Sequence, residues 1–138
     1  PHYWFYKLDY LLWKNDSIWK NLNLNLDLSN FRLSRLNSIE HIYPQQPLKP
    51  KEEWNNSQKL NNFGNLALIS NHMNSSLNNR DYNEEKRGLL MNQLNKGTIE
   101  SLKMILLYSK YKEWTPENCD EHQIEMINLL IGDLNNAK

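Results

Sequence analysis

Two strand-like segments and one helix-like segment follow one another in the middle of the chain. Residues 31–43 largely alternate between apolar and polar side chains, and Pro44 then ends the pattern, which is typical of one or two strands closed by a turn. A second short apolar run spans residues 65–70 and ends at the good helix-capping residue Ser70. A helix is predicted over residues 72–79. The sequence therefore predicts strands followed directly by a helix.

Helices are predicted on both sides of this centre. Apolar side chains recur at helical spacing over residues 3–14, and a further helix is expected over residues 82–94. Thr98 is the expected cap of a helix that extends to Tyr111, and Thr115 with Pro116 is expected to begin the last helix. One apolar face of that last helix is predicted from Ile124, Ile127, Leu130, Ile131 and Leu134.

Two segments are less well defined. In residues 22–28, leucine alternates with asparagine and aspartate, which favours a strand, although leucine forms helices more readily than strands. Residues 44–62 show no regular period and contain several prolines, so a long loop or a short helix around Trp54 is expected.

Composition excludes several classes of protein. The 138 residues carry 16 Lys and Arg and 16 Asp and Glu, so the overall basic excess of a non-specific nucleic-acid binder is missing. The single Cys119 excludes an internal disulfide and a zinc site made of several thiolates, which fits a reducing compartment and makes the cytoplasm the expected location. No apolar run approaches the roughly 20 residues that cross a bilayer. The chain begins without Met, so we expect a fragment of a longer protein.

Chemically useful side chains gather in the central segment. Glu40 and His41 are adjacent at a predicted strand end, Asn65 begins the second strand, and Asn74 lies in the following helix. An imidazole can accept a proton near neutral pH. Carboxylate and amide oxygens are the hard ligands that Mg²⁺ and Mn²⁺ prefer. Together they are typical of a ββα metal nuclease.

Five short motifs in order carry a resemblance to a known family. They are Ile39-Glu40-His41-Ile42, Pro44-Gln45, Gly64-Asn65-Leu66-Ala67-Leu68-Ile69, Asn74-Ser75-Ser76-Leu77 and Glu85-Lys86. The sequence resembles the HNH (His-Me finger) nuclease domain at the C-terminus of Gmr-type modification-dependent restriction endonucleases. The match is close over residues 38–87 and looser over residues 3–135, with Ala67 where threonine is usual.

The resemblance implies an α+β fold with a ββα-metal core at about residues 36–80, embedded in a mainly helical single domain. The helical flanks would be residues 3–14 and 82–135. It also implies a single Mg²⁺ or Mn²⁺ ion as the cofactor. His41 would be the general base, Glu40 and Asn74 the metal ligands, and Asn65 the residue that braces the loop carrying His41. The predicted phosphate-binding residues are Lys86, Arg87 and Arg80.

Simpler interpretations exist for each residue. Glu40 and His41 could form a surface ion pair, and Asn65 could be an ordinary turn residue after glycine. Three other side chains compete with Asn74 as the ligand from the helix, namely Asn71, His72 and Asn78. Lys86 and Arg87 could belong to a charged helix face. His2 and His122 are expected at the surface, and Cys119 is expected to be an inert, partly buried thiol.

The resulting hypothesis is the DNA-cutting domain of a restriction or phage-defence protein, with DNA as its partner and no membrane. The resemblance also implies an upstream, nucleotide-dependent N-terminal domain that recognises modified DNA. Two alternatives stay open. One is a non-catalytic interaction or regulatory module on the same scaffold, and the other is a nuclease directed at RNA.

Overall fold

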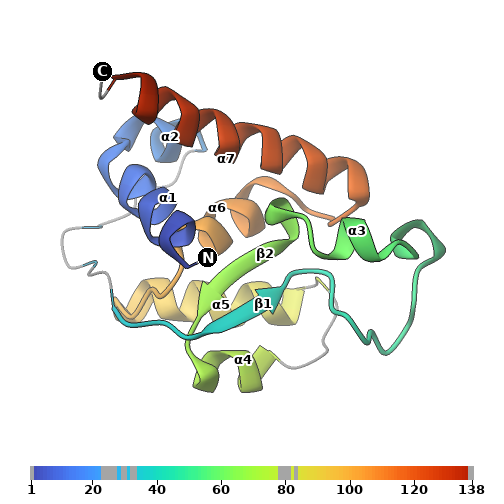
Figure 1. Ribbon diagram of the computed structural model, residues 1–138. Coiled ribbons are helices and arrows are strands. Elements are labelled where there is room, and N and C mark those ends of the chain that lie inside the picture. The colour runs from blue at the N-terminus through green and yellow to red at the C-terminus, as the bar shows by residue number, and fades with distance from the viewer. Residues whose placement is uncertain are drawn as a thin grey trace.

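The computed structural model describes residues 2–22, 28, 31, 34–77, 82 and 84–136. Its fold is α+β, as predicted, with helices surrounding one small sheet (Figure 1). In chain order the elements, with η for a 3-10 helix, are α1 (Tyr3–Lys14), α2 (Asp16–Asn21), β1 (Ser38–His41), η1 (Glu52–Trp54), α3 (Ser57–Leu60), η2 (Phe63–Asn65), β2 (Leu66–Ile69), α4 (Asn71–Leu77), α5 (Glu84–Lys96), α6 (Leu102–Lys110) and α7 (Pro116–Asn136).

The two strands pair antiparallel, with Ser38 opposite Ile69 and His41 opposite Leu66. Helix α4 follows β2 directly and contacts β1, which completes the predicted strand–strand–helix order. Of the one or two strands predicted in residues 31–43, the structure shows β1 alone among the residues it describes there, and this strand is short because β2 offers only four residues for pairing. Within the other predicted strand, residues 23–27 lie outside the described part of the chain.

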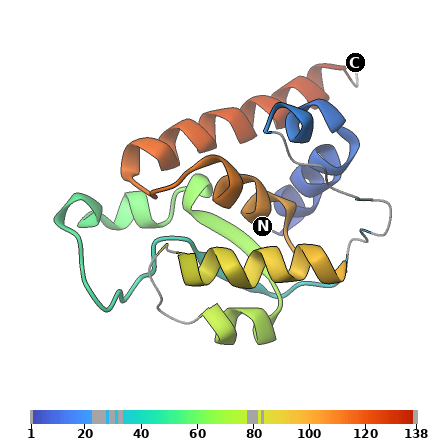
Figure 2. The same cartoon turned by 180° about the vertical axis from the view of Figure 1, so that it is seen from behind.

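Helices cover the sheet from several sides. In Figure 1, α7 crosses the top, α4 lies below the sheet and α5 lies behind it; the reverse view in Figure 2 brings α5 to the front. Helix α1 contacts α6 and α7, and α5 contacts α6. The main core contains fully buried side chains from these layers, among them Leu8, Ile69 and Ile105. Within the described residues, no helix is both long and apolar enough to cross a membrane.

Helix α6 begins three residues later than its sequence suggested. Its N-cap is Ser101, whose hydroxyl accepts a hydrogen bond from the amide of Met104 at 3.2 Å, so the assignment of the cap to Thr98 was wrong. The carboxylate of Asp9 on α1 accepts the amides of Leu102 and Lys103, both at 3.2 Å. A carboxylate at a helix N-terminus satisfies amides that have no partner within the helix. This contact spans more than 90 residues of sequence, so local patterns do not reveal it.

Helix α7 begins at Pro116 with Thr115 as its cap, as predicted; the Thr115 hydroxyl accepts the Asn118 amide at 3.1 Å. The predicted apolar face was wrong except for Leu130. The helix buries Cys119, His122 and Met126 instead. Four predicted core residues are 37–61 % exposed, namely Ile124, Ile127, Ile131 and Leu134.

Aromatic contacts explain which face α7 buries. The ring of His122 lies edge-on to Tyr111 and Trp114, and the histidine is fully buried, which corrects its expected surface position. Packing against these rings therefore overrides the simple hydrophobic pattern of the helix.

Candidate functional site: a cleft between β1 and α4

A cleft of about 490 Å³ opens beside the end of β1. Its lining residues are Ile39, Glu40, His41, Pro44, Gln45, Gln46, Asn74 and Ser75. Three residues singled out from the sequence, Glu40, His41 and Asn74, thus lie on one cavity although α4 is separated from β1 by some 30 residues of sequence.

Adjacent strand residues normally point to opposite faces. Glu40 and His41 can both border the cleft because β1 ends at His41 and the chain bends at Ile42 and Tyr43. The chain then turns through Pro44 along the cleft wall. The end of the strand is therefore what lets two consecutive side chains reach the same cavity.

The carboxylate of Glu40 is unusually placed. The residue is 4 % exposed, and among the described residues Oε2 has no hydrogen-bond partner. Burial raises the pKa of Glu40 to about 7, while the charge of Lys86 and the His41 amide act in the opposite direction. A buried carboxylate oxygen without a partner costs free energy, and a bound cation would remove that cost.

His41 has a defined ring orientation. Its Nε2 lies 3.0 Å from Oδ1 of Asn61, which belongs to the loop before η2. An amide oxygen can only accept a hydrogen bond, so we assign the proton of the neutral ring to Nε2. Nδ1 then carries the lone pair that can accept a proton. Asn61 was not singled out in the sequence, because it lies in an irregular loop with several other asparagines.

Asn65 is fully buried, and its side chain makes four hydrogen bonds to three residues of the fold. Oδ1 accepts the Tyr43 amide at 2.8 Å and the Trp114 indole N–H at 2.9 Å. Nδ2 donates to the carbonyl oxygens of Tyr43 at 3.1 Å and Leu60 at 2.9 Å. The Asn65 carbonyl also accepts the Ile42 amide at 2.8 Å. These contacts hold the segment that follows His41.

Gly64 allows α7 to approach this loop closely. A Cβ at residue 64 would lie 2.6 Å from the carbonyl oxygen of Cys119 and 2.8 Å from Cβ of Gln123. The Gly64 amide donates to the Gln123 side chain at 2.8 Å. Cys119 is buried, as expected, and burial raises the pKa of its thiol to about 12, which keeps it in the unreactive thiol form.

The position of Asn74 follows from the start of α4. The Ser70 hydroxyl accepts the Met73 amide at 3.1 Å, and both the amide and the hydroxyl of Ser70 donate to the Glu100 carboxylate. Of the competing ligands, Asn71 and His72 are exposed and are not among the residues that line the cleft. Asn78 lies outside the described residues.

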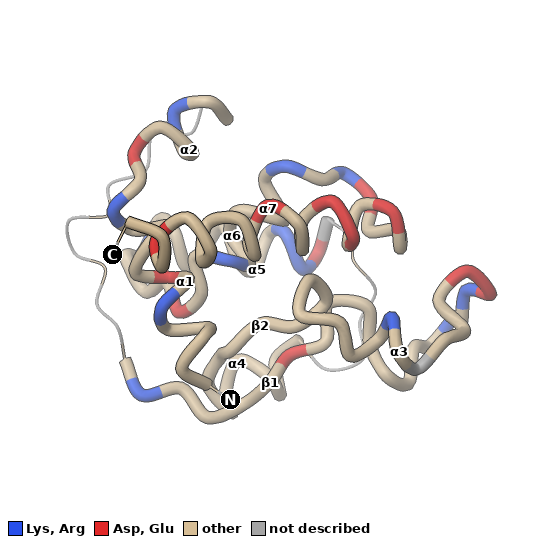
Figure 3. Tube along the Cα trace, turned by 45° about the horizontal axis from the view of Figure 1, so that its top comes forward, with Lys and Arg blue, Asp and Glu red and all other residues tan. Residues whose placement is uncertain are grey.

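Lys86 and Arg87, the two predicted phosphate-binding residues that the structure describes, do not line the cleft. Lys86 is fully buried on α5. Arg87 donates to the carbonyl oxygens of Tyr108 and Tyr111, both at 3.1 Å, so its guanidinium is engaged within the fold. Arg80 lies outside the described residues. Figure 3 shows the basic positions spread over several elements.

The two predicted ligands at the cleft, Glu40 and Asn74, offer one carboxylate and one amide, which suits a hard divalent ion that keeps several water ligands. Among the residues that the structure describes, no three His, Cys, Asp or Glu side chains are grouped to hold a metal ion. The side chains of Asn74 and of Glu40, whose Oε2 has no partner among the described residues, fit a hard divalent ion as partial ligands.

The fold and cleft define a ββα unit with a histidine and two oxygen donors at its edge. Over residues 1–129 the chain matches the family model described as GmrSD restriction endonucleases, C-terminal domain. The chain belongs to this family of restriction endonuclease domains. No curated protein and no solved structure matches it significantly.

Proposed function

We propose that this domain hydrolyses phosphodiester bonds of DNA with the help of a divalent metal ion bound in the cleft. The observation that carries the proposal is the convergence of Glu40, His41 and Asn74 on one cavity, with a buried carboxylate oxygen that has no partner among the described residues. Membership in a restriction endonuclease family supports DNA as the substrate.

His41 is the proposed general base. Its Nδ1 takes a proton from the water that attacks phosphorus, while the contact from Nε2 to Asn61 keeps the ring in the required tautomer. The products would be a 5′-phosphate and a 3′-hydroxyl. A positioned general base of this kind contributes on the order of 10²–10⁴ in rate.

Glu40 and Asn74 are the proposed ligands of a single Mg²⁺ or Mn²⁺ ion. When bound, the ion supplies positive charge that stabilises the phosphate in the transition state. The buried Lys86 favours the ionised form of Glu40, because its charge lowers the pKa of that carboxyl group. We propose this electrostatic role for Lys86 in place of phosphate contact, because the residue is fully buried. Phosphate contact by Arg80 stays a prediction.

Asn65 is proposed to brace the loop that carries His41 and to make no contact with substrate. Its complete burial and its hydrogen bonds to Tyr43 support this role. We further propose that the domain is the HNH-type cutting part of a modification-dependent phage-defence protein, in which an N-terminal nucleotide-dependent domain provides DNA recognition. A neutral cutting domain fits this division of labour, since it lacks the charge for tight DNA binding by itself.

Plasmid nicking tests the proposal. The purified chain is incubated with supercoiled DNA and Mg²⁺, Mn²⁺ or EDTA, in parallel with the variants His41→Ala and His72→Ala. His72 is the matched control, because it is exposed on the helix of the site and does not border the cleft. We expect metal-dependent nicking in the wild type and in His72→Ala, and a loss of at least about 100-fold in His41→Ala.

Circular dichroism of each variant checks that the fold is retained. Equal nicking by His41→Ala would contradict the proposed base. Cleavage of a matched RNA but not of DNA would redirect the activity to RNA, and metal binding without cleavage of either in the full-length protein would favour the non-catalytic module.

A further inference from the structure

A buried lysine contacts the backbone on both sides of Asn65. Lys103 lies on α6 and is 1 % exposed. Its ammonium group donates to the carbonyl oxygen of Gly64 at 3.2 Å and to that of Leu66 at 2.6 Å. Lys103 therefore holds the carbonyl groups of the two residues that flank Asn65.

These two carbonyl groups are close to the strand that carries His41. Leu66 is the pairing partner of His41 in the sheet. Asn65, between them, accepts the amides of Ile42 and Tyr43 through its main-chain and side-chain oxygens, respectively. A displacement of the Gly64–Leu66 backbone would thus disturb the pairing of Leu66 with His41. It would also move the bend at Ile42 and Tyr43, which is bonded to Asn65.

The main chain of Lys103 is also held in place. The Lys103 amide donates to Oδ1 of Asp9, which ties the first turn of α6 to α1. The ammonium nitrogen also lies 5.1 Å from the centre of the Phe63 ring, within the range of a cation–π contact. Because both its main-chain amide and its ammonium group are hydrogen-bonded, Lys103 connects α6 to the loop in a defined position.

The burial of Lys103 and Asp9 reduces the stability of the fold. Burial lowers the pKa of Lys103 to about 7 and raises that of Asp9 to about 7, which reflects the penalty of removing charges from water. Apolar side chains of similar volume often replace such buried charges without loss of stability. The same position filled by methionine would still pack in the core, but it could not hold the two carbonyl groups.

We infer that Lys103 is a positioning residue for His41, acting through the backbone of Gly64 and Leu66 and through Asn65 between them. The inference rests on the proposed function for its catalytic meaning. Its structural part can be tested without any activity, because it predicts that loss of the Lys103 ammonium group increases the mobility of the Ile42–Tyr43 segment.

Hydrogen exchange followed by NMR tests this structural prediction directly. The amides of Ile42 and Tyr43 are compared with the amides of Leu8 and Leu12 in α1, which report global unfolding. In Lys103→Met, we expect exchange at Ile42 and Tyr43 to accelerate by roughly tenfold or more, since hydrogen bonds from a charged donor are lost. Exchange in α1 should accelerate less than exchange at Ile42 and Tyr43, because it reports only the accompanying loss of global stability.

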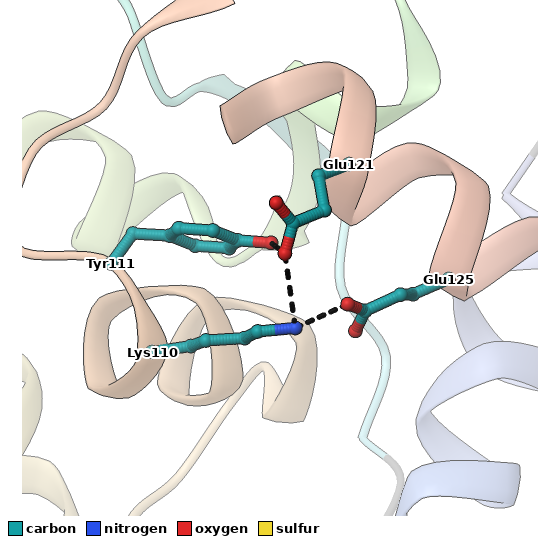
Figure 4. A network of polar contacts seen from close by, with 4 residues as sticks. All are labelled: Lys110, Tyr111, Glu121 and Glu125. Carbon is teal, nitrogen blue, oxygen red and sulfur yellow. Dashed lines mark hydrogen bonds and ion pairs between the residues drawn. The ribbon is translucent and has the colours of Figure 1, made fainter. Parts of the chain in front are cut away.

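Lys110→Met is the matched control on the same helix. Lys110 joins α6 to α7 through Glu121, at 3.4 Å, and Glu125, while the Tyr111 hydroxyl donates to Glu121 (Figure 4). Its removal should affect all reporter amides to a similar and smaller extent, because Lys110 does not contact the loop of Asn65. If Lys103→Met does not fold, Lys103→Gln is compared in the same way.

Unchanged exchange at Ile42 and Tyr43 in Lys103→Met, or acceleration equal to that in α1, would overturn the inference. Cleavage provides a second readout: kcat should fall by roughly tenfold or more while KM changes less than about twofold. If the full-length wild type does not cut, the proposed function fails, and the exchange result still decides whether Lys103 positions the loop.

Discussion

The cleft and the loop around Asn65 lie next to each other, yet their polar side chains are used in opposite ways. Glu40 lines the cleft, and its buried Oε2 has no partner among the described residues. Around Asn65, both side-chain polar atoms are bonded, to Tyr43, Leu60 and Trp114. On the proposed function, the first region receives a metal ion and the second keeps the first in place.

The difference separates two kinds of mutational effect. A change in a satisfied, buried network leaves several groups without partners, so it should reduce stability. A change of a cleft side chain removes a group that the fold does not need, so it should reduce metal binding or cleavage with little loss of stability. Substitutions in each region test whether this separation holds.

The largest expected effect on stability is that of Asn65→Ala. The substitution leaves the Tyr43 amide and carbonyl, the Leu60 carbonyl and the Trp114 indole without their partner. We expect the free energy of unfolding to fall by about 3–5 kcal/mol, as measured by urea denaturation. The exposed Asn128 on α7 is the control, and Asn128→Ala should stay within about 0.5 kcal/mol of the wild type. Equal stability of both variants would remove the distinction between the two regions.

Two glycine substitutions should change the stability of the fold in opposite directions. In Gly64→Ala, the new Cβ would meet the Cys119 carbonyl oxygen, a backbone atom, so we expect a loss of about 1–3 kcal/mol. Gly88 lies within α5, and a Cβ added there would meet no atom of the described residues within 4 Å. Gly88→Ala should therefore stabilise the protein by about 0.5–1 kcal/mol through helix propensity. Thermal denaturation compares the two, and a stabilising Gly64→Ala would argue against the close approach of α7 to the loop.

His122 should make the region around Asn65 sensitive to acid. Burial, together with the charges of Lys103 and Lys110, lowers the pKa of His122 well below its ordinary value, so the ring is neutral in the folded chain. Below about pH 6.5 the unfolded chain binds a proton that the folded chain does not, and stability falls as the pH decreases. The loss should reach at most about 1.4 kcal/mol per pH unit.

The variant His122→Phe keeps an aromatic ring beside Trp114 and removes the titrating group. Urea denaturation at several pH values should show that the stability of the variant relative to the wild type increases as the pH falls from 7 to 5. A difference that is independent of pH would show that His122 does not carry this sensitivity.

The order of strands and helices could be predicted from the sequence because it depends on local signals. Alternation, Pro44, and the capping residues Ser70 and Thr115 indicate where elements end or begin. The start of α6 could not, because Asp9, far away in sequence, helps to satisfy its first turn. The buried face of α7 could not either, since the packing of His122 against the rings of Tyr111 and Trp114, just before the helix, overrides the hydrophobic pattern.

In the candidate site, too, some residues could be predicted from local motifs and others could not. Motifs singled out Glu40, His41 and Asn74, and the fold brings them to one cleft. Asn61 and Lys103 gave no comparable signal: the first is one asparagine among many, and the second lies in a helix where a lysine would ordinarily face solvent. Their positions depend on tertiary contacts alone.

Mn²⁺ binding followed by NMR tests the central claim most directly, because a paramagnetic ion broadens the signals of nearby amides. We expect selective broadening at Glu40, His41 and Asn74 in the wild type and in the control Glu53→Gln, whose residue is exposed on η1, but not in Glu40→Gln. Binding should weaken below about pH 7, because the pKa of Glu40 is raised to about 7 and only the carboxylate binds the ion. Broadening that is the same in Glu40→Gln, or that is centred away from the cleft, would contradict the account.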